Sequence, residues 1–323
     1  MTSGGTAWRS SAAVTDERAA VPDWRRRLQL LLAGIWLLDA VLQYQSFMFT
    51  KAFAQMLGGT AAGNPAMIAD PITWSARLIG SHVMVMDAIF ATIQLLLGLG
   101  IAWRPTVRIA LGASIIWAVA VWWLGEGLGA VLTPGASPLN GAPGAVIIYA
   151  LLAVLLWPVA RNRPVPFVAG RAVGVRAARV LWLVLWASLA FFALTPASRA
   201  PQATSSMISG MASGQPGWLA WIDNHAASSL SHDGLAVSIV LAVALIVCAV
   251  GVYLPPPAAR ATLVLAFVVA AAIWLAEGLG GILTGSGTDP NSGPLLALLA
   301  MAYWPSRTAV NAAAPQPAPG PTG

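Results

Sequence analysis

The sequence predicts an all-α integral membrane protein in which eight transmembrane helices form two parallel four-helix repeats. Of the 323 residues, 58% are hydrophobic and 9% are charged, whereas soluble proteins carry about 25% charged residues. Several apolar runs approach the roughly twenty residues that cross a bilayer. The segment WWLGEGLG at 122–129 also returns as IWLAEGLG at 273–280, and their glutamates, Glu126 and Glu277, lie 277 − 126 = 151 residues apart.

This internal similarity continues downstream of the two glutamates. The same offset of 151 residues relates Thr133 to Thr284, Asn140 to Asn291, and Pro143 to Pro294. Because four helices return the chain to the side of the membrane where it started, both repeats would have the same orientation. We therefore expect a cytoplasmic tail (1–27), a first repeat (28–160), a basic cytoplasmic linker (161–179), a second repeat (180–310) and a disordered tail (311–323).

The first repeat is expected to contain helices over 28–49, 82–103, 109–132 and 145–160, which are the apolar stretches between its polar and glycine- or proline-rich segments. A long polar segment, 50–81, separates the first two helices and contains an amphipathic piece. A short basic turn at Arg104-Pro105 joins the second helix to the third. The glycine-flanked Glu126 lies in the last part of the third helix.

The second repeat follows the same plan. Its helices are expected over 180–194, 234–254, 261–283 and 293–304, and its polar segment over 195–233. The three consecutive prolines from Pro255, followed by Arg260, make the turn that corresponds to the basic turn of the first repeat. The last helix is the shortest apolar stretch of the eight.

The distribution of basic residues predicts the orientation in the membrane. Sixteen of the 17 basic residues are arginines, and most lie in the tail, the linker and the two short turns. Short cytoplasmic loops carry the excess of arginine and lysine, so both termini are expected in the cytoplasm, with the protein spanning a bacterial inner membrane several times. The same explanation accounts for a pI near 10.4 without a nucleic-acid partner; the expected partner is the lipid bilayer.

The polar groups within this apolar chain are the candidate site residues. Ionisable residues in a spanning segment cost about 2.5–3.5 kcal/mol each, so each suggests a function. Glu126 lies 126 − 108 = 18 residues beyond Arg108, which places it about 27 Å from the inner face, near the outer boundary. Glu277 falls at a similar depth, and His82 and His232 begin helices at the same outer level. Alternatively, each glutamate accepts hydrogen bonds from the following loop, and each histidine caps a helix.

The two repeats differ in their acidic residues. The first carries Asp39 and Asp87, whereas the second has Leu189 at the register of Asp39 and Val237 or Ser238 at that of Asp87. If one repeat is active and the other supportive, we expect the first to be the active one. Its candidate catalytic residues are Glu126, His82 and Asp87. The candidate ligand-binding residues are Asp39, Gln43, Arg77, Glu277 and His232.

Several other kinds of site find no support in the sequence. The lone Cys248 lies within an apolar run, so neither a disulfide framework nor a cysteine metal site is expected. His82 and Glu126 lack further ligands at helical spacing, so no metal site is predicted. The glycines of GEGLG follow a helix and do not match the nucleotide-binding GxGxxG pattern.

The block IQLLLGLGIAWRP at 93–105, followed by a short basic turn and a third helix, resembles DoxX-type membrane proteins. Such proteins are four-helix bundles with a glycine-rich second helix, a tight inner turn with arginine and a long outer loop after the first helix. The whole chain would then be a tandem pair. The resemblance implies a respiratory or thiol/quinone-linked membrane subunit; the glycine-flanked glutamates do not belong to that pattern.

Three functions follow from these observations. In the first, a quinone or a small thiol compound binds between helices near the outer face, Glu126 handles protons, His82 hydrogen-bonds the ligand, and a redox partner protein supplies or accepts electrons. In the second, Asp39, Asp87 and Glu126 are steps in a proton-coupled carrier of small solutes. In the third, the protein is a membrane scaffold without a ligand, and the glutamates are structural.

Overall fold

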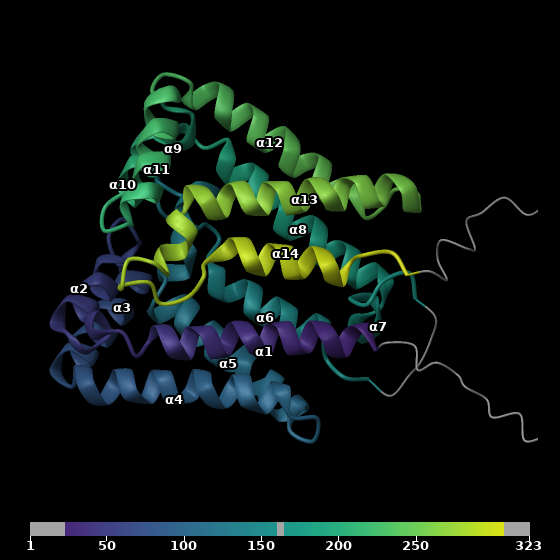
Figure 1. Ribbon diagram of the computed structural model, residues 1–323, viewed down its shortest axis with the longest axis horizontal. Coiled ribbons are helices and arrows are strands. Elements are labelled where there is room, and N and C mark those ends of the chain that lie inside the picture. The colour runs from purple at the N-terminus through teal and green to yellow at the C-terminus, as the bar shows by residue number, and fades with distance from the viewer. Residues whose placement is uncertain (1–22, 160–164, 307–323) are drawn as a thin grey trace, which may run out of the picture.

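The computed structural model describes residues 23–159 and 165–306, and the described chain is helical throughout its regular structure. Long helices run side by side, and most of the short helices gather at one end of this bundle (Figure 1). The helices long and apolar enough to cross a bilayer are α4 (Val83–Ala102), α5 (Val107–Leu124), α8 (Val175–Ala193), α12 (Gly234–Gly251) and α13 (Pro256–Ala276). The all-α class and the multi-pass membrane character are therefore confirmed.

The N-terminal part of the structure, residues 23–159, begins with α1 (Trp24–Leu42), which packs along α4. In the sequence, η1 (Ser46–Phe49), α2 (Lys51–Gly59) and α3 (Ala66–Ser81) come between α1 and α4. The predicted polar segment 50–81 is therefore largely helical. After α5 come two short 3-10 turns, η2 (Gly127–Ala130) and η3 (Pro138–Asn140), and then α6 (Ala145–Leu155), which packs on α5.

The C-terminal part, residues 165–306, has α8 packed on α12 and α13 packed on α14 (Ser292–Ala302). The short helices between α8 and α12 are α9 (Pro196–Arg199), α10 (Ala203–Met211) and α11 (Gly217–Ser229). The remaining elements are α7 (Gly170–Val173) and η4 (Gly278–Gly281). Contacts of α14 with α6 and with α1 join the two parts.

The observed helix bounds differ from the predicted ones where glycine changes the backbone. The helix expected over 109–132 ends at Leu124, because Leu128 and Gly129 in the next turn have φ of 58° and 62°. The helix expected over 261–283 likewise ends at Ala276, before Leu279 with φ 55°. A left-handed backbone cannot continue a right-handed helix, so both acids follow a helix end.

The predicted boundaries of the tail and linker shift as well. Residues 24–27, expected in the tail, form the first turn of α1. The expected linker, 161–179, contains α7 and the first turns of α8; its residues 161–164 lie outside the described residues. The expected disordered tail, 311–323, also lies outside them.

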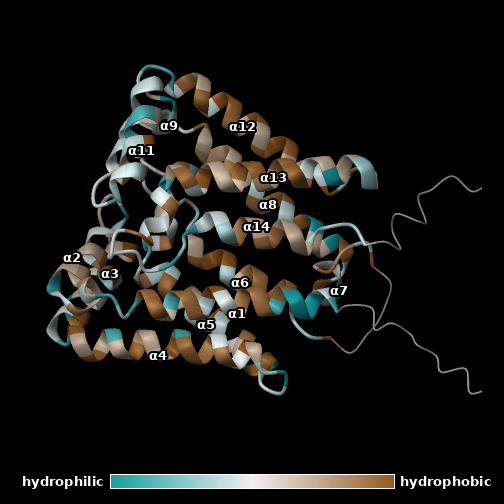
Figure 2. Ribbon diagram, viewed as in Figure 1, coloured by the Kyte–Doolittle hydropathy of each residue, from teal (hydrophilic) through white to brown (hydrophobic). Residues whose placement is uncertain are grey.

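The long helices bury small and large apolar side chains against one another and leave other apolar side chains exposed. Trp182 and Tyr149 are 1% exposed, whereas Ile109 and Ile116 on α5 are 76% and 73% exposed. Figure 2 shows that the bodies of the long helices are predominantly hydrophobic. Exposed apolar surface of this extent suits contact with lipid chains.

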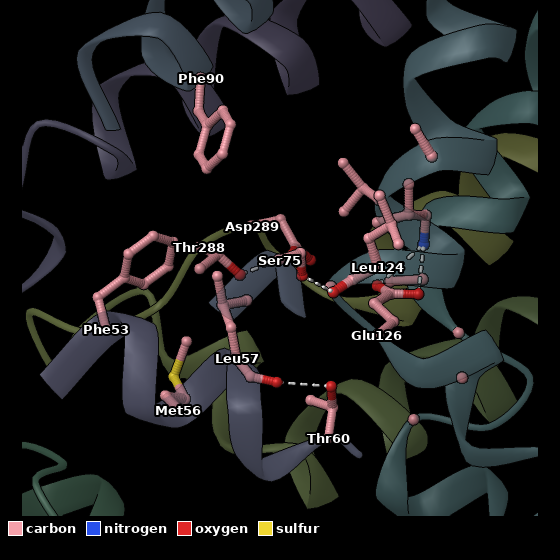
Figure 3. Close-up of a pocket in the computed structure, with 18 of the residues that line it drawn as sticks. Phe53, Met56, Leu57, Thr60, Ser75, Phe90, Leu124, Glu126, Thr288 and Asp289 are labelled. Carbon is pink, nitrogen blue, oxygen red and sulfur yellow. Dashed lines mark hydrogen bonds between the residues drawn. The ribbon is translucent and has the colours of Figure 1, made fainter. Parts of the chain in front are cut away.

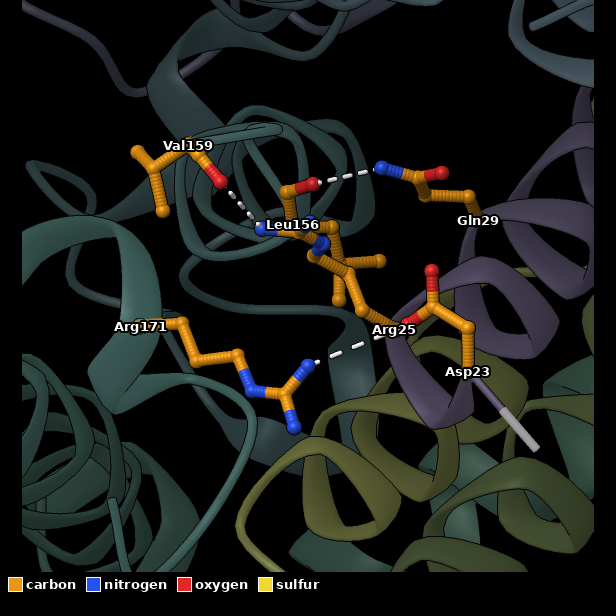
Figure 4. A network of polar contacts seen from close by, with 6 residues as sticks. All are labelled: Asp23, Arg25, Gln29, Leu156, Val159 and Arg171. Atoms are coloured by element: carbon orange, nitrogen blue, oxygen red, sulfur yellow. Dashed lines mark hydrogen bonds and ion pairs between the residues drawn. The ribbon is translucent and has the colours of Figure 1, made fainter. Parts of the chain in front are cut away.

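Polar contacts surround the start of α1 (Figure 4). The buried Gln29 amide donates to the Leu156 carbonyl at 2.8 Å, and the Arg25 guanidinium donates to the Val159 carbonyl at 3.5 Å. Arg171 forms an ion pair with Asp23 at 3.8 Å. These contacts tie the start of α1 to the chain after α6 and to α7.

Candidate functional site

A cavity of about 690 Å³ lies where the short helices α2 and α3 meet the long helices of the N-terminal part. Figure 3 shows Phe53, Met56 and Phe90 on one side and Glu126 on the other. Much of the lining is apolar, and the aromatic residues in it are Trp36, Phe53, Trp74, Phe90, Trp117 and Tyr149. Cavities of this size and character accommodate drug-sized molecules.

Two polar side chains at the end of α1 line this cavity. Asp39 is 1% exposed and Gln43 is 4% exposed; four residues apart, they share one face of the helix. The Tyr149 hydroxyl on α6 donates to Asp39 Oδ2 at 2.7 Å. Asp39 Oδ1 and Gln43 Oε1 have no hydrogen-bond partner among the described residues. We call these two oxygens the α1 acceptor pair.

Glu126 reaches the cavity from the turn that follows α5. Its carboxylate oxygens accept from the backbone N–H of Val146, at 3.2 and 3.4 Å. Val146 is in the first turn of α6, where the helix dipole favours negative charge. A Cβ on Gly144 would overlap Glu126 Oε2 and Trp122, so the glycine allows the carboxylate to approach α6.

A loop in the C-terminal part of the chain supplies another acid. Thr288, Asp289 and Asn291, in the loop before α14, line the same cavity, and Figure 3 shows Thr288 and Asp289 beside it. Asp289 Oδ1 accepts from the Asn291 N–H at 2.7 Å, and its Oδ2 accepts from the Thr288 hydroxyl at 2.9 Å. The C-terminal part therefore completes a cavity built mainly by the N-terminal part.

The acids around the cavity influence one another. Burial raises the pKa of Glu126 well above its ordinary value, and the charges of Asp289 and Glu277 raise it further, while the Val146 N–H opposes the shift. Burial also raises the pKa of Asp289. The described lining includes Asp39, Glu126 and Asp289 but no arginine, lysine or histidine. The cavity therefore has a negative or neutral character, depending on protonation, with no basic side chain in that lining.

The rim of the cavity is apolar and exposed. Met56 on α2, and Trp74 and Leu78 on α3, line the cavity and are 41%, 58% and 39% exposed. Indole rings are common at the membrane–water boundary. The opening between α2 and α3 is therefore suited to entry by a lipophilic molecule from the bilayer boundary.

The chemistry of this cavity has to be inferred from its own residues. No protein-family model, curated protein or solved structure matches the chain. Within the described residues, no group of three or more His, Cys, Asp or Glu side chains could hold a metal ion. The cavity thus offers carboxylates, side-chain amides and aromatic rings as its recognition groups.

The structure brings together Asp39, Gln43 and Glu126 of the predicted site residues and places the others elsewhere. His82 and His232 are exposed, and each ring Nδ1 contacts the hydroxyl of the preceding serine, at 2.8 and 3.0 Å. Arg77 is exposed and donates to the Thr73 carbonyl at 3.2 Å. Asp87 is fully buried in α4, outside the cavity lining, and neither carboxylate oxygen has a partner among the described residues.

Glu277 has different surroundings from Glu126. It is 3% exposed and accepts a 2.8 Å hydrogen bond from the Ser292 hydroxyl at the start of α14. Burial raises the pKa of Glu277 to about 8. In the C-terminal part, a cavity of only about 10 Å³ is lined by Leu139 from η3 together with residues of α8, α9, α10 and α12.

Several cavity residues were missed in the sequence analysis. Asp289 lies in a polar loop, where an acid is ordinary, and only the fold shows that this loop reaches the other part of the chain. The sequence did contain a signal for Tyr149, because this residue carries a hydroxyl group within an otherwise apolar helix. The aromatic residues Phe53, Phe90 and Trp117 lie on three different helices, so their convergence was not visible in the sequence.

Proposed function

We propose that this protein is a multi-pass membrane protein that binds a lipophilic small molecule in the cavity between α1–α6 and the 288–291 loop. The observation that carries the proposal is the exposed apolar rim, Met56, Trp74 and Leu78, leading into an aromatic-lined cavity of about 690 Å³. A molecule dissolved in the bilayer would reach such an opening without first entering water. Its apolar body would pack against the rings, and its polar group would meet the buried acceptors.

The membrane architecture that we propose has eight spans in two parallel four-helix repeats. The shorter apolar helices α6 and α14, together with α1, would complete the eight. In support, α8 begins 175 − 24 = 151 residues after α1, and α12 begins 234 − 83 = 151 residues after α4. Leu128 and Leu279, at the same offset, also share a left-handed backbone, with φ of 58° and 55°.

We propose an inner-membrane location with both termini in the cytoplasm. Arg25, Arg108, Arg176 and Arg260 all lie within the first five residues of long helices. Those helix starts share the end of the bundle opposite α2, α3 and α11 (Figure 1). The positive-inside rule assigns that end to the cytoplasm. The cavity would then open at the outer boundary of the membrane.

Both the redox hypothesis and the carrier hypothesis require a ligand, and this cavity is where we place it. A quinone is one lipophilic molecule of suitable size, and a quinone-linked function with a redox partner protein, as the DoxX resemblance implies, stays a prediction. His82 is not among the lining residues, so a quinone oxygen would instead find a donor in the Gln43 or Gln94 amide or in a protonated carboxyl group.

Binding of the neutral lipophilic dye Nile red to the protein in lipid nanodiscs tests the proposed function. Ala120 on α5 lines the cavity, whereas Ala113 on the same helix is exposed and lies outside the lining. We expect a saturable fluorescence increase that Ala120→Phe removes and Ala113→Phe preserves. A signal without saturation, or one equally affected by both substitutions, would refute ligand binding in the cavity. Displacement of the dye by decylubiquinone would support the quinone hypothesis.

A further inference from the structure

Three buried polar atoms of the cavity lining are acceptors without donors. Asp39 Oδ1, Gln43 Oε1 and Gln94 Oε1 all belong to lining residues, and none has a hydrogen-bond partner among the described residues. These side chains are 1%, 4% and 8% exposed. A buried acceptor left unsatisfied destabilises the protein, so a ligand that carries N–H donors would relieve that cost.

The charges of the lining point to the same kind of ligand. Asp39, Glu126 and Asp289 are acids, no basic side chain appears in the described lining, and the charge of Asp289 acts on both Asp39 and Glu126. An organic cation would be attracted by ionised carboxylates. An anionic ligand would meet repulsion without a compensating basic group.

The aromatic lining completes this recognition pattern. Trp36, Trp117 and Tyr149 come from three different helices and line the cavity beside the acids. The faces of such rings attract ammonium groups, and their apolar area accepts a hydrocarbon body. Metal cations are a poorer match, because the described residues provide no cluster of three metal-binding side chains.

We propose that the ligand of this cavity is a lipophilic primary ammonium ion, whose N–H groups donate to the α1 acceptor pair. This proposal rests on the proposed function, since it assigns a chemical class to the molecule bound there. Tyr149 holds Asp39 Oδ2 at 2.7 Å and leaves Oδ1 for the ligand. Glu126 and Asp289 add negative potential when ionised, and the hydrocarbon part of the ligand lies toward the rim at Met56 and Trp74.

Three matched compounds separate charge from donor capacity. Phenylbutylamine has charge and N–H donors, phenylbutyltrimethylammonium has charge alone, and phenylbutanol is neutral. We expect the primary amine to displace Nile red at a concentration about tenfold below that needed for either of the others. Of the three compounds, only the amine can form charge-assisted hydrogen bonds, which are roughly twice as strong as neutral ones. Equal potency of the amine and the alcohol, or of the primary and quaternary ions, would overturn the assignment.

Two buried acids provide a matched pair of variants. Asp39→Asn should abolish the preference for the primary amine, whereas Asp87→Asn should keep it, since Asp87 is equally buried but outside the cavity lining. Gln43→Met provides a second test that leaves every acid in place, and we expect the preference to fall severalfold. A preference unchanged in both Asp39→Asn and Gln43→Met would overturn the proposal.

The same measurements distinguish failure of this inference from failure of the proposed function. If Nile red binds saturably and Ala120→Phe removes the binding, but the amine shows no preference, the cavity binds lipophilic molecules of another class. If Nile red shows no saturable binding at all, the proposed function itself fails.

Discussion

The Tyr149 hydroxyl donates a 2.7 Å hydrogen bond to the Asp39 carboxylate, and both residues are 1% exposed. This bond joins α1 to α6 at the wall of the cavity. Because it satisfies one of the two carboxylate oxygens and fixes the ring of Tyr149, it sets the direction in which the other oxygen faces. The bond is therefore a structural support of the site as well as a contact between helices.

Removing this hydroxyl should destabilise the protein. We expect Tyr149→Phe to lower the free energy of unfolding by about 1–3 kcal/mol, the cost of leaving the buried Asp39 Oδ2 without a hydrogen-bond partner. Tyr303→Phe is the matched control, since Tyr303 is equally buried and donates to the neutral carbonyl of Ala178, with an expected loss of about 1 kcal/mol. Thermal unfolding in detergent compares the two; a larger loss for Tyr303→Phe would contradict the assigned importance of the Asp39 bond.

The turn after α5 should not tolerate a side chain at Gly129. This residue has φ 62°, and a Cβ there would overlap the Pro143 carbonyl. We expect Gly129→Ala to cost roughly 3 kcal/mol or more, through backbone strain and the overlap. Gly34→Ala, in an exposed and open helical position of α1, should be neutral or stabilising by up to about 1 kcal/mol. The yield of folded protein and its thermal stability measure both; normal stability of Gly129→Ala would show that the turn has another conformation.

Trp122 and Trp274, which lie near the ends of α5 and α13, should differ in their contribution to stability. Trp122 Nε1 donates to the Pro143 carbonyl at 2.7 Å, whereas the buried Trp274 Nε1 has no partner among the described residues. Trp122→Phe should therefore cost about 1 kcal/mol more than Trp274→Phe, because only the first loses a hydrogen bond. Chemical or thermal unfolding of the two single variants measures this difference, and equal losses would argue against the Trp122 bond.

Stability should depend on pH through Glu277. Its pKa rises to about 8 in the folded protein, mainly through burial, from an ordinary value of 4.5. Between these values the folded state binds more protons than the unfolded state, so this contribution is complete below pH 4.5 and is lost as the pH rises through 8. Unfolding free energy should fall by about 1 kcal/mol per pH unit within this window.

Glu277→Gln removes this titration, so the decline between pH 6 and pH 8 should be smaller than in the wild-type protein. Asp233→Asn is the control, because Asp233 is exposed at the start of α12 and should leave the decline unchanged. An identical pH profile for Glu277→Gln and the wild type would refute the assignment of the decline to Glu277.

The sequence predicted the features that depend on hydropathy and missed those that depend on packing. The starts of α4 and α12 fall within one residue of the predicted ones, because each follows a polar segment directly. The helices that precede Glu126 and Glu277 were predicted to end later in the sequence than they do. The reason is that apolar residues such as Leu128 continue beyond the last helical residue. Local hydropathy does not record a left-handed backbone.

The part of the site that the sequence predicted consists of single polar residues within or beside apolar helices. Asp39 and Glu126 stood out because a carboxylate within or beside an apolar run is costly, and both line the cavity. His82 attracted attention on the same grounds of depth, yet it is exposed at the junction of α3 and α4. Whether a side chain at that junction faces the cavity or the surface depends on how α3 folds back.

The position of Asp289 in the cavity has a consequence for biosynthesis. A ribosome has produced most of the polypeptide before residues 288–291 emerge, although α1 to α6 are by then complete. A nascent or truncated chain that stops before this loop would lack one of the three acids and two further polar contacts of the site. The lining of the cavity would thus be complete only at the last stage of synthesis, just before α14 is made.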